Sequence, residues 1–412
     1  MINFERFTLP NGLKVLVHND ATTPIVAVNI LYDVGAKDEN PSRTGFAHLF
    51  EHLMFGGSIN IPEYDSPLQN AGGENNAFTN NDFTNYYLTV PKINLETAFW
   101  LESDRMLSLA FTPKSLEVQR KVVIEEFKQR YLNQPYGDVS HLLRKMIFKI
   151  HPYQWPTIGK EISHIENASL TDVKNFFFGH YGPNNAFLSL AGDITAKEVK
   201  PLVEKWFGNI PTRKISKREL PGEPPQTKRQ FQKVERKVPA SAIFKAFHMV
   251  ERKNPDYYVT DVISDLLSNG NSSRLYQKLV REKQLFTNIN AYISGSIEPG
   301  LFTIEGILSN NIQPEDAEQA IDNEIQKIID GNFSETELNK VKNKFEANYT
   351  FSNYELDERA LNLAYFELLG NAIMINEEIE KYQQVTKNDI MRVAKELFKQ
   401  ENTSVLYYLS EQ

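Results

Sequence analysis

Three polar residues in one short segment, His48, Glu51 and His52, have the types and the spacing of a metal site. Residues four apart in a helix lie on the same face, so the two imidazoles can reach one ion, and Glu51 lies beside them. The other residues of 46–54 are apolar, so we expect a helix that is buried except along this stripe. Unpartnered polar groups are costly to bury, and a metal ion would supply the partner. The alternative is a pair of core histidines that protein groups satisfy.

Glu126 offers a third ligand from a second helix, which is predicted to begin near Thr112 and Pro113. The predicted apolar face of that helix consists of Val118, Val122, Val123 and Phe127. Glu126 lies in the middle of this face and Glu125 toward its edge, an unexpected place for a carboxylate on a helix that faces water. Two histidines, one glutamate and an open position form the shell of a catalytic zinc. A buried salt bridge is the alternative for Glu126.

Glu51 is predicted to be the catalytic base. It shares the stripe of the two histidines and is not needed as a ligand, so it is free to accept a proton from a zinc-bound water and to donate it later. The composition restricts other sites, because the 412 residues include no cysteine and any transition-metal site must therefore use His, Asp and Glu. The net charge of −8 argues weakly against a nucleic-acid partner.

No membrane segment is expected. The first residues do not form a basic segment followed by an apolar run, and no apolar stretch approaches the roughly 20 residues that span a bilayer. We therefore expect a cytoplasmic protein, or a periplasmic one if a signal peptide has been removed.

The pattern of strands and helices predicts an α+β fold with two halves of similar length. Residues 1–212 form the predicted zinc-binding catalytic half, 213–236 a linker rich in Pro, Lys, Arg and Gln, and 237–412 a homologous half without the metal motif. Each half is expected to contain an antiparallel sheet with helices packed on it.

The two halves repeat one pattern, a strand followed by an apolar helix that ends in glycine. The strand Val26–Tyr32 corresponds to Ala242–Met249, and the helix Phe46–Gly57 corresponds to Val259–Gly270. His48, Glu51 and His52 then fall opposite Asp261, Ser264 and Asp265. We infer an internal duplication in which only the first copy retains a site.

With these residues in place, the sequence resembles the pitrilysin family of inverted-motif zinc peptidases, which includes insulin-degrading enzyme and the mitochondrial processing peptidase. The segments His48-x-x-Glu51-His52 and Val122–Phe127 match the two parts of the family's metal motif. Further matching segments are Phe7–Leu13, Gly73–Thr79, Asn85–Tyr87, Tyr181–Asn184, Gly192–Asp193 and Ser272–Leu275. The likeness covers nearly the whole chain and implies one zinc ion per chain and two halves that form a clamshell-like chamber.

The resemblance also implies substrate-binding residues. Asn76, Ala77, Phe78 and Thr79 would lie on an edge strand to which a peptide substrate adds as a further strand. Many relatives carry a glutamate seven residues before the ligand, whereas this chain has Gln119, which we expect to orient Glu126 through a hydrogen bond. An ordinary exposed edge strand is the alternative for Asn76–Thr79.

A last resemblance bears on partners. Active relatives carry an Arg and, seven residues later, a Tyr that contact the substrate from the second half; here Arg281 matches, but Asn288 replaces the Tyr. We therefore expect a heterodimer with a homologous subunit that supplies the Arg/Tyr pair, or otherwise a homodimer. The alternatives are that Asn288 donates a hydrogen bond itself or that the nearby Tyr292 does so.

The sequence thus predicts a zinc-dependent endopeptidase or oligopeptidase that acts on unfolded peptides. The first rival is a catalytically silent structural or assembly subunit of the same family, which the intact His48, Glu51, His52 and Glu126 oppose. The second rival is a metal-dependent hydrolase of non-peptide substrates, which the strand-like substrate segment opposes.

Overall fold

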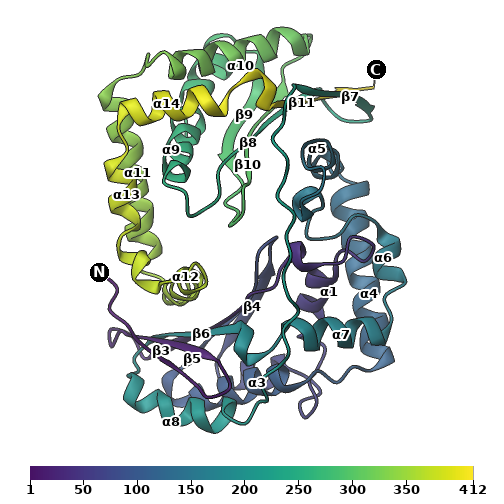
Figure 1. The fold of residues 1–412 in the computed structure, drawn as a ribbon, viewed down its shortest axis with the longest axis vertical. Helices are drawn as coiled ribbons and strands as arrows, with labels where there is room; N and C mark the ends of the chain where they lie inside the picture. Colours follow the sequence, from purple (N-terminus) through teal and green to yellow (C-terminus); the bar gives the residue numbers. More distant parts are fainter. Residues whose placement is uncertain (412) are drawn as a thin grey trace. The chain divides into compact units, whose positions relative to one another are not determined.

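The computed structural model describes residues 1–411, and the chain divides into two compact units. Unit 1 comprises Met1–Arg130, His151–Pro221 and Thr350–Asn376. Unit 2 comprises Tyr131–Ile150, Gly222–Tyr349 and Glu377–Gln412. Each unit is built on one sheet with helices packed on it (Figure 1).

The sheet of unit 1 has six strands in the order β1-β2-β6-β3-β5-β4. The strands are β1 (Glu5–Thr8), β2 (Lys14–Asn19), β3 (Ile25–Tyr32), β4 (Glu74–Thr79), β5 (Thr84–Pro91) and β6 (Ala186–Gly192). The helices are α1 (Phe46–Leu53), α2 (Asp65–Asn70), α3 (Leu95–Leu107), α4 (Pro113–Phe127), α6 (Ile162–Glu166), α7 (Leu170–His180), α8 (Ala196–Phe207) and α12 (Leu356–Leu368). β4 forms one edge of this sheet and pairs with β5 alone.

The sheet of unit 2 has five strands in the order β7-β11-β8-β10-β9. The strands are β7 (Gln230–Arg236), β8 (Ala242–His248), β9 (Phe286–Ile293), β10 (Leu301–Leu308) and β11 (Thr403–Ser410). The helices are α5 (Val139–Ile147), α9 (Asp256–Ser268), α10 (Pro314–Ile329), α11 (Glu335–Ser352), α13 (Glu378–Gln384) and α14 (Lys387–Leu397). β7 occupies the last seven residues of the segment predicted as a linker, 213–236.

The two sheets have the same topology. If β1 is set aside, β2, β6, β3, β5 and β4 correspond in order to β7, β11, β8, β10 and β9. Each sheet has one parallel pair, β2 with β6 and β7 with β11, while the other pairs are antiparallel. The predicted α+β class and the two homologous halves are confirmed, with sheets that are mostly rather than wholly antiparallel.

One helix from each half of the sequence packs on the sheet of the other half. α5, from the first half, lies against β8 and β11 in unit 2, where the Tyr408 hydroxyl donates a hydrogen bond of 2.7 Å to Asp138 beside the helix. α12, from the second half, lies against β3 and β6 in unit 1, where Arg359 bonds His18 at 2.9 Å and Asp20 at 2.5 Å. The compact units therefore differ from a simple division of the chain at residue 212.

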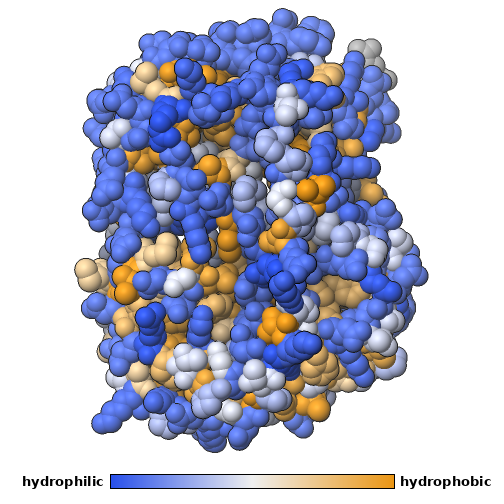
Figure 2. Space-filling view, viewed as in Figure 1, coloured by the Kyte–Doolittle hydropathy of each residue, from blue (hydrophilic) through white to orange (hydrophobic). Residues whose placement is uncertain are grey.

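Apolar residues are concentrated inside the units, and in the view of Figure 2 most of the visible surface is hydrophilic, with hydrophobic residues in small groups. Within the part of the chain that the structure describes, no helix is long and apolar enough to cross a bilayer.

Candidate metal centre and active site

α1 carries His48, Glu51 and His52 and is held by an aromatic core. Phe46, Ala47, Leu49, Phe50 and Leu53 are buried. The ring of Phe50 stacks on Phe176 and on Tyr181, with centroids 5.2 Å apart in both pairs. The helix begins after Gly45, whose φ of 88° favours glycine because a side chain is strained there. The predicted burial on all sides except the polar stripe is therefore observed, and it fixes the direction in which the histidines point.

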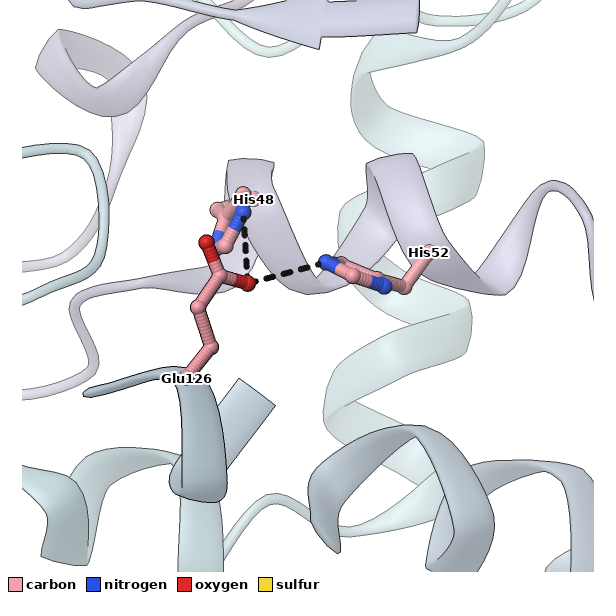
Figure 3. A group of neighbouring side chains, drawn as sticks. All are labelled: His48, His52 and Glu126. Atoms are coloured by element: carbon pink, nitrogen blue, oxygen red, sulfur yellow. Dashed lines mark ion pairs between the residues drawn. The ribbon is translucent and has the colours of Figure 1, made fainter. Parts of the chain in front are cut away.

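His48, His52 and Glu126 converge at one place, with His48 and His52 on α1 and Glu126 on α4 (Figure 3). Oε2 of Glu126 lies 3.5 Å from Nε2 of His48 and 3.4 Å from Nε2 of His52. These separations exceed those of ordinary hydrogen bonds. They match the distance of about 3.4 Å between neighbouring ligands in a tetrahedron with zinc–ligand bonds near 2.0–2.1 Å. Both distances from the carboxylate oxygen to an imidazole nitrogen thus suit a shared ion, and the three donor atoms, of types that zinc prefers, all lie within 4.8 Å of one another.

The electrostatics favour the ligand forms of these residues. Burial lowers the pKa of His48 to about 4, so its imidazole is neutral and has a lone pair for a metal. The adjacent His52, followed by His48 and Arg130, lowers the pKa of Glu126, so its carboxylate is ionised. A neutral imidazole and an ionised carboxylate are the states in which these groups coordinate a cation.

Glu51 lies next to these ligands without being one of the three. Burial raises the pKa of its carboxyl, and the neighbouring Thr79, at the end of β4, partly offsets this. A raised carboxyl pKa strengthens a carboxylate as a proton acceptor near neutral pH. The structure therefore brings Glu51, the three ligand candidates and the end of the edge strand into one site.

Arg130 contacts Glu126 from the other side, and the sequence analysis did not identify it. Its Nη1 lies 2.9 Å from Oε1 of Glu126, which leaves Oε2 toward the histidines. The signal was available, because an acid and a base four residues apart in a helix are neighbours. Gln119, predicted for this orienting role, lies near Gly56, and within residues 1–411 no hydrogen bond joins it to Glu126.

The predicted apolar face of α4 is partly wrong. Val118 and Val122 are exposed, at 47% and 44%, whereas Val123, Phe127 and the unpredicted Leu116 are buried. Hydrophobicity alone placed Val118 and Val122 inside, but the orientation of a helix is set by the elements packed against it, here α1 and α6. Glu126 consequently lies at the boundary of the buried face, where it reaches α1.

The predicted substrate segment lies on β4, whose outer edge is free of strand partners within residues 1–411. Asn76, Ala77, Phe78 and Thr79 pair in antiparallel register with Tyr87, Tyr86, Asn85 and Thr84 of β5. A free edge with this extended backbone is the geometry that peptide addition requires.

The residues predicted for the second half lie in unit 2. Arg281 is exposed in the π-helical segment Tyr276–Glu282, and Asn288 is exposed on the edge strand β9. The hydroxyl of Tyr292, on the same strand, donates a hydrogen bond of 3.0 Å to Glu305. Its proton is therefore already directed to a carboxylate of its own unit.

Comparison with known proteins decides the family. Residues 14–161 match the family model described as "Insulinase (Peptidase family M16)", and residues 167–345 match that described as "Peptidase M16 inactive domain". The chain belongs to the pitrilysin (M16) family of peptidases. The family's first model covers α1 and α4 with the whole candidate metal centre, and its second covers α9 with the equivalent positions of the second half.

The similarity to individual relatives extends over nearly the whole of this chain. The chain is 28% identical over 412 residues to "Zinc protease PqqE" of Helicobacter pylori, and the match covers 98% of this chain and 92% of the relative. The chain is 27% identical to the "Mitochondrial-processing peptidase subunit beta" of Saccharomyces cerevisiae, and the match covers 93% of this chain and 86% of that subunit. The crystal structure of a protease from Helicobacter pylori superposes on this chain with a TM-score of 0.93 at 26% sequence identity. The superposition covers 99% of this chain and 100% of that protease. All three relatives bear the name of a protease or peptidase, one of them that of a zinc protease, and the shared fold extends through both halves.

Proposed function

We propose that this M16 protein is a zinc-dependent peptidase that hydrolyses internal bonds of unfolded peptides. The observation that carries the proposal is the convergence of His48, His52 and Glu126, with Oε2 of Glu126 3.4–3.5 Å from Nε2 of each histidine and Glu51 beside them. The name of one relative, a zinc protease of Helicobacter pylori, supports the same metal and the same class of reaction.

Nε2 of His48, Nε2 of His52 and Oε2 of Glu126 would hold the zinc ion, one per chain. The bound ion would lower the pKa of a water molecule and polarise the scissile carbonyl. Glu51 accepts the proton of the attacking water and returns it to the leaving amine, a task for which its raised pKa suits it. Arg130 holds Oε1 of Glu126, so that Oε2 stays directed at the two imidazoles.

The substrate would add to β4 as a further antiparallel strand along Asn76–Thr79. Thr79 lies next to Glu51, so a strand that pairs to the end of β4 carries a peptide bond toward the catalytic carboxylate. Because pairing of this kind uses backbone groups, it selects extended, unfolded peptides and leaves side-chain preferences broad.

A homologous subunit that supplies an Arg/Tyr pair is the proposed partner. Asn288 stands in place of the Tyr, and Tyr292 already donates its hydroxyl proton to Glu305, which argues against Tyr292 as a substitute. A relative of this chain bears the name of a processing-peptidase subunit, which supports assembly with a second chain.

The test measures zinc content and cleavage of a quenched peptide library by the purified chain, alone and with its homologous partner. About one zinc per chain, and cleavage that Glu51→Gln abolishes, are expected. A chain that binds zinc and cleaves nothing in either setting would instead be a silent subunit.

A further inference from the structure

A buried carboxylate lies at the beginning of the catalytic helix and belongs to none of the groups assigned so far. Glu39 is 5% exposed and follows the short 3-10 helix Ala36–Asp38. Its Oε1 accepts a hydrogen bond of 2.8 Å from the backbone N–H of Ala47, and its Oε2 accepts one of 2.9 Å from that of Gly45. Gly45 and Ala47 frame the first turn of α1, and Ala47 directly precedes His48.

A third donor completes the environment of Glu39. The indole Nε1 of Trp155, which is 1% exposed, donates to Oε2 of Glu39 at 3.0 Å and to the carbonyl of Ala36 at 3.0 Å. The three groups that bond the carboxylate are all N–H donors, the arrangement that suits an ionised carboxylate, which only accepts. Even with these three donors, which favour the ionised form, burial raises the pKa of Glu39 to about 8. The geometry nevertheless favours the ionised form, because the O–H of a protonated carboxyl would find no acceptor among these three N–H groups.

The position of this charge matters for a metal on α1. The N-terminus of a helix carries a partial positive charge of roughly half an elementary charge, which disfavours a cation at the first turn. His48 is the third residue of α1, so a dication on its imidazole would lie near that positive end. A carboxylate bonded to the same N–H groups offsets the positive potential and also fixes the turn that points His48.

The other helix-capping acids of the chain differ from Glu39. Glu198, for example, accepts hydrogen bonds from Thr195 N–H at 2.9 Å and Thr195 Oγ1 at 2.8 Å at the start of α8, but it is exposed to solvent and α8 bears none of the metal-ligand candidates. Glu39 thus combines burial, charge and adjacency to a ligand, whereas an ordinary cap needs only the hydrogen bonds.

We propose that Glu39 is a positioning residue for the metal centre, whose buried carboxylate sets the first turn of α1 and compensates its positive end so that His48 binds a divalent cation tightly. The inference rests on the proposed zinc site and deepens it. Partners that act on a metal through its ligands typically change metal affinity by roughly 10- to 100-fold when they are replaced.

The experiment measures the dissociation constant of Zn²⁺ for the purified full chain by competition with a chromophoric chelator. Glu39→Gln keeps the shape and removes the charge, and it sets an amide against the N–H of Ala47 or Gly45. We expect it to bind Zn²⁺ about 10-fold or more weakly than the parent. Glu198→Gln is the matched control: it removes the charge of a capping carboxylate at the start of α8 and should leave the Zn²⁺ affinity unchanged.

Two further readouts separate positioning from general destabilisation. The first is the visible spectrum of the chain saturated with Co²⁺ in place of zinc, which reports ligand geometry and should change in Glu39→Gln but not in Glu198→Gln. The second is the melting temperature without metal, which both variants are expected to lower. Trp155→Phe retains the charge and removes one donor, so it should weaken Zn²⁺ binding by less than Glu39→Gln does.

The outcomes are distinct. A parent chain that fails to bind Zn²⁺ would refute the proposed function itself. A parent that binds, with a Glu39→Gln variant that melts cooperatively and binds within twofold of it, would overturn the role of Glu39 alone. If Glu39→Gln does not fold, Trp155→Phe decides the question, and an affinity and Co²⁺ spectrum identical to the parent's would overturn the inference.

Discussion

The first helix of each half of the sequence, α1 and α9, occupies the same place in two sheets of the same topology, but the two helices present different chemistry. On α1, two imidazoles face a carboxylate of α4 at distances suited to an ion. On α9, the equivalent residues Asp261, Ser264 and Asp265 are already satisfied: Asp261 accepts from Tyr382 at 2.7 Å and Asp265 from Asn269 at 2.5 Å.

The helices that follow in the chain also differ. α4 supplies the anionic Glu126 to the site on α1, whereas Lys340 and Lys344 of α11 supply positive charge near Asp265. A pocket of about 360 Å³ remains beside α9, lined among others by Asp261, Asp265, Tyr292 and Glu305. The duplication kept the scaffold in both halves, so the function depends on a few side chains rather than on the fold.

The largest expected effect comes from removing a proposed metal ligand from α1 and comparing the result with the same change on α9. His52→Ala removes one of the three proposed ligands and should weaken zinc binding by at least roughly 100-fold, more than the loss of a supporting partner does. Metal content after dialysis measures it. Asp265→Ala, at the equivalent position of α9, is the control and should retain the zinc of the parent, and equal zinc in both variants would exclude His52 from the site.

Glu51→Gln should abolish cleavage and leave both fold and zinc intact, because the amide cannot accept the proton. General-base catalysis contributes roughly 100-fold or more, so turnover of a quenched peptide should fall at least that far. Ser264→Ala changes the equivalent position of α9 and should leave turnover unchanged. Turnover by Glu51→Gln within about tenfold of the parent would assign the base to another group.

Asp261→Asn should stabilise the protein at neutral pH. Burial raises the pKa of Asp261 to about 6. The stabilisation of the folded protein by the protonated carboxyl is therefore fully present below the pKa of the unfolded state and is lost as the pH rises through 6. The cost of the buried anion above that pH is on the order of 1–3 kcal/mol. Between pH 4 and pH 7, the free energy of unfolding measured with denaturant should fall less for the variant than for the parent. The variant retains the hydrogen bond from Tyr382.

Asp389→Asn provides the control of opposite sign. Hydrogen bonds from Thr386 lower the pKa of Asp389, so its ionised form stabilises α14 and the Asn variant should be less stable at pH 7. If the stability of Asp261→Asn falls between pH 4 and pH 7 as steeply as that of the parent, ionisation of Asp261 does not destabilise the folded protein.

Local patterns predicted most of the helices and brought forward the residues of the candidate metal centre. The helix expected over 46–54 is observed at Phe46–Leu53, and that predicted to begin near Thr112 and Pro113 begins at Pro113, because periodicity and capping are properties of neighbouring residues. His48 and His52 share a helix, so their convergence is also local. The strands β4 and β5 carried no clear alternation, and only the resemblance to the family indicated that β4 is an edge strand.

Features that depend on distant segments were missed. The exchange of α5 and α12 between the units arises from contacts between residues far apart in sequence, which periodicity does not encode. The exposure of Val118 and Val122 follows from which side of α4 meets α1 and α6. The indole of Trp155 reaches Glu39 across 116 residues of sequence. Sequence patterns therefore locate reactive residues more readily than the groups that hold them in place.

The smallest expected effect concerns the residues of β9 in unit 2. If a partner subunit supplies the Arg/Tyr pair, Asn288→Ala and Tyr292→Phe should leave the activity of the assembled complex within about twofold of the parent, whereas the loss of a donor used in the transition state costs roughly 100- to 1,000-fold. The chain alone should be weakly active, and adding a homologous subunit that carries the pair should raise its turnover. Changing the Tyr of that subunit to Phe should reverse the gain, which locates the missing donor in the partner. Full activity without a partner, undiminished in both β9 variants, would refute trans-complementation. A chain that is active alone but loses activity in Asn288→Ala or Tyr292→Phe would instead show that this unit supplies its own donor.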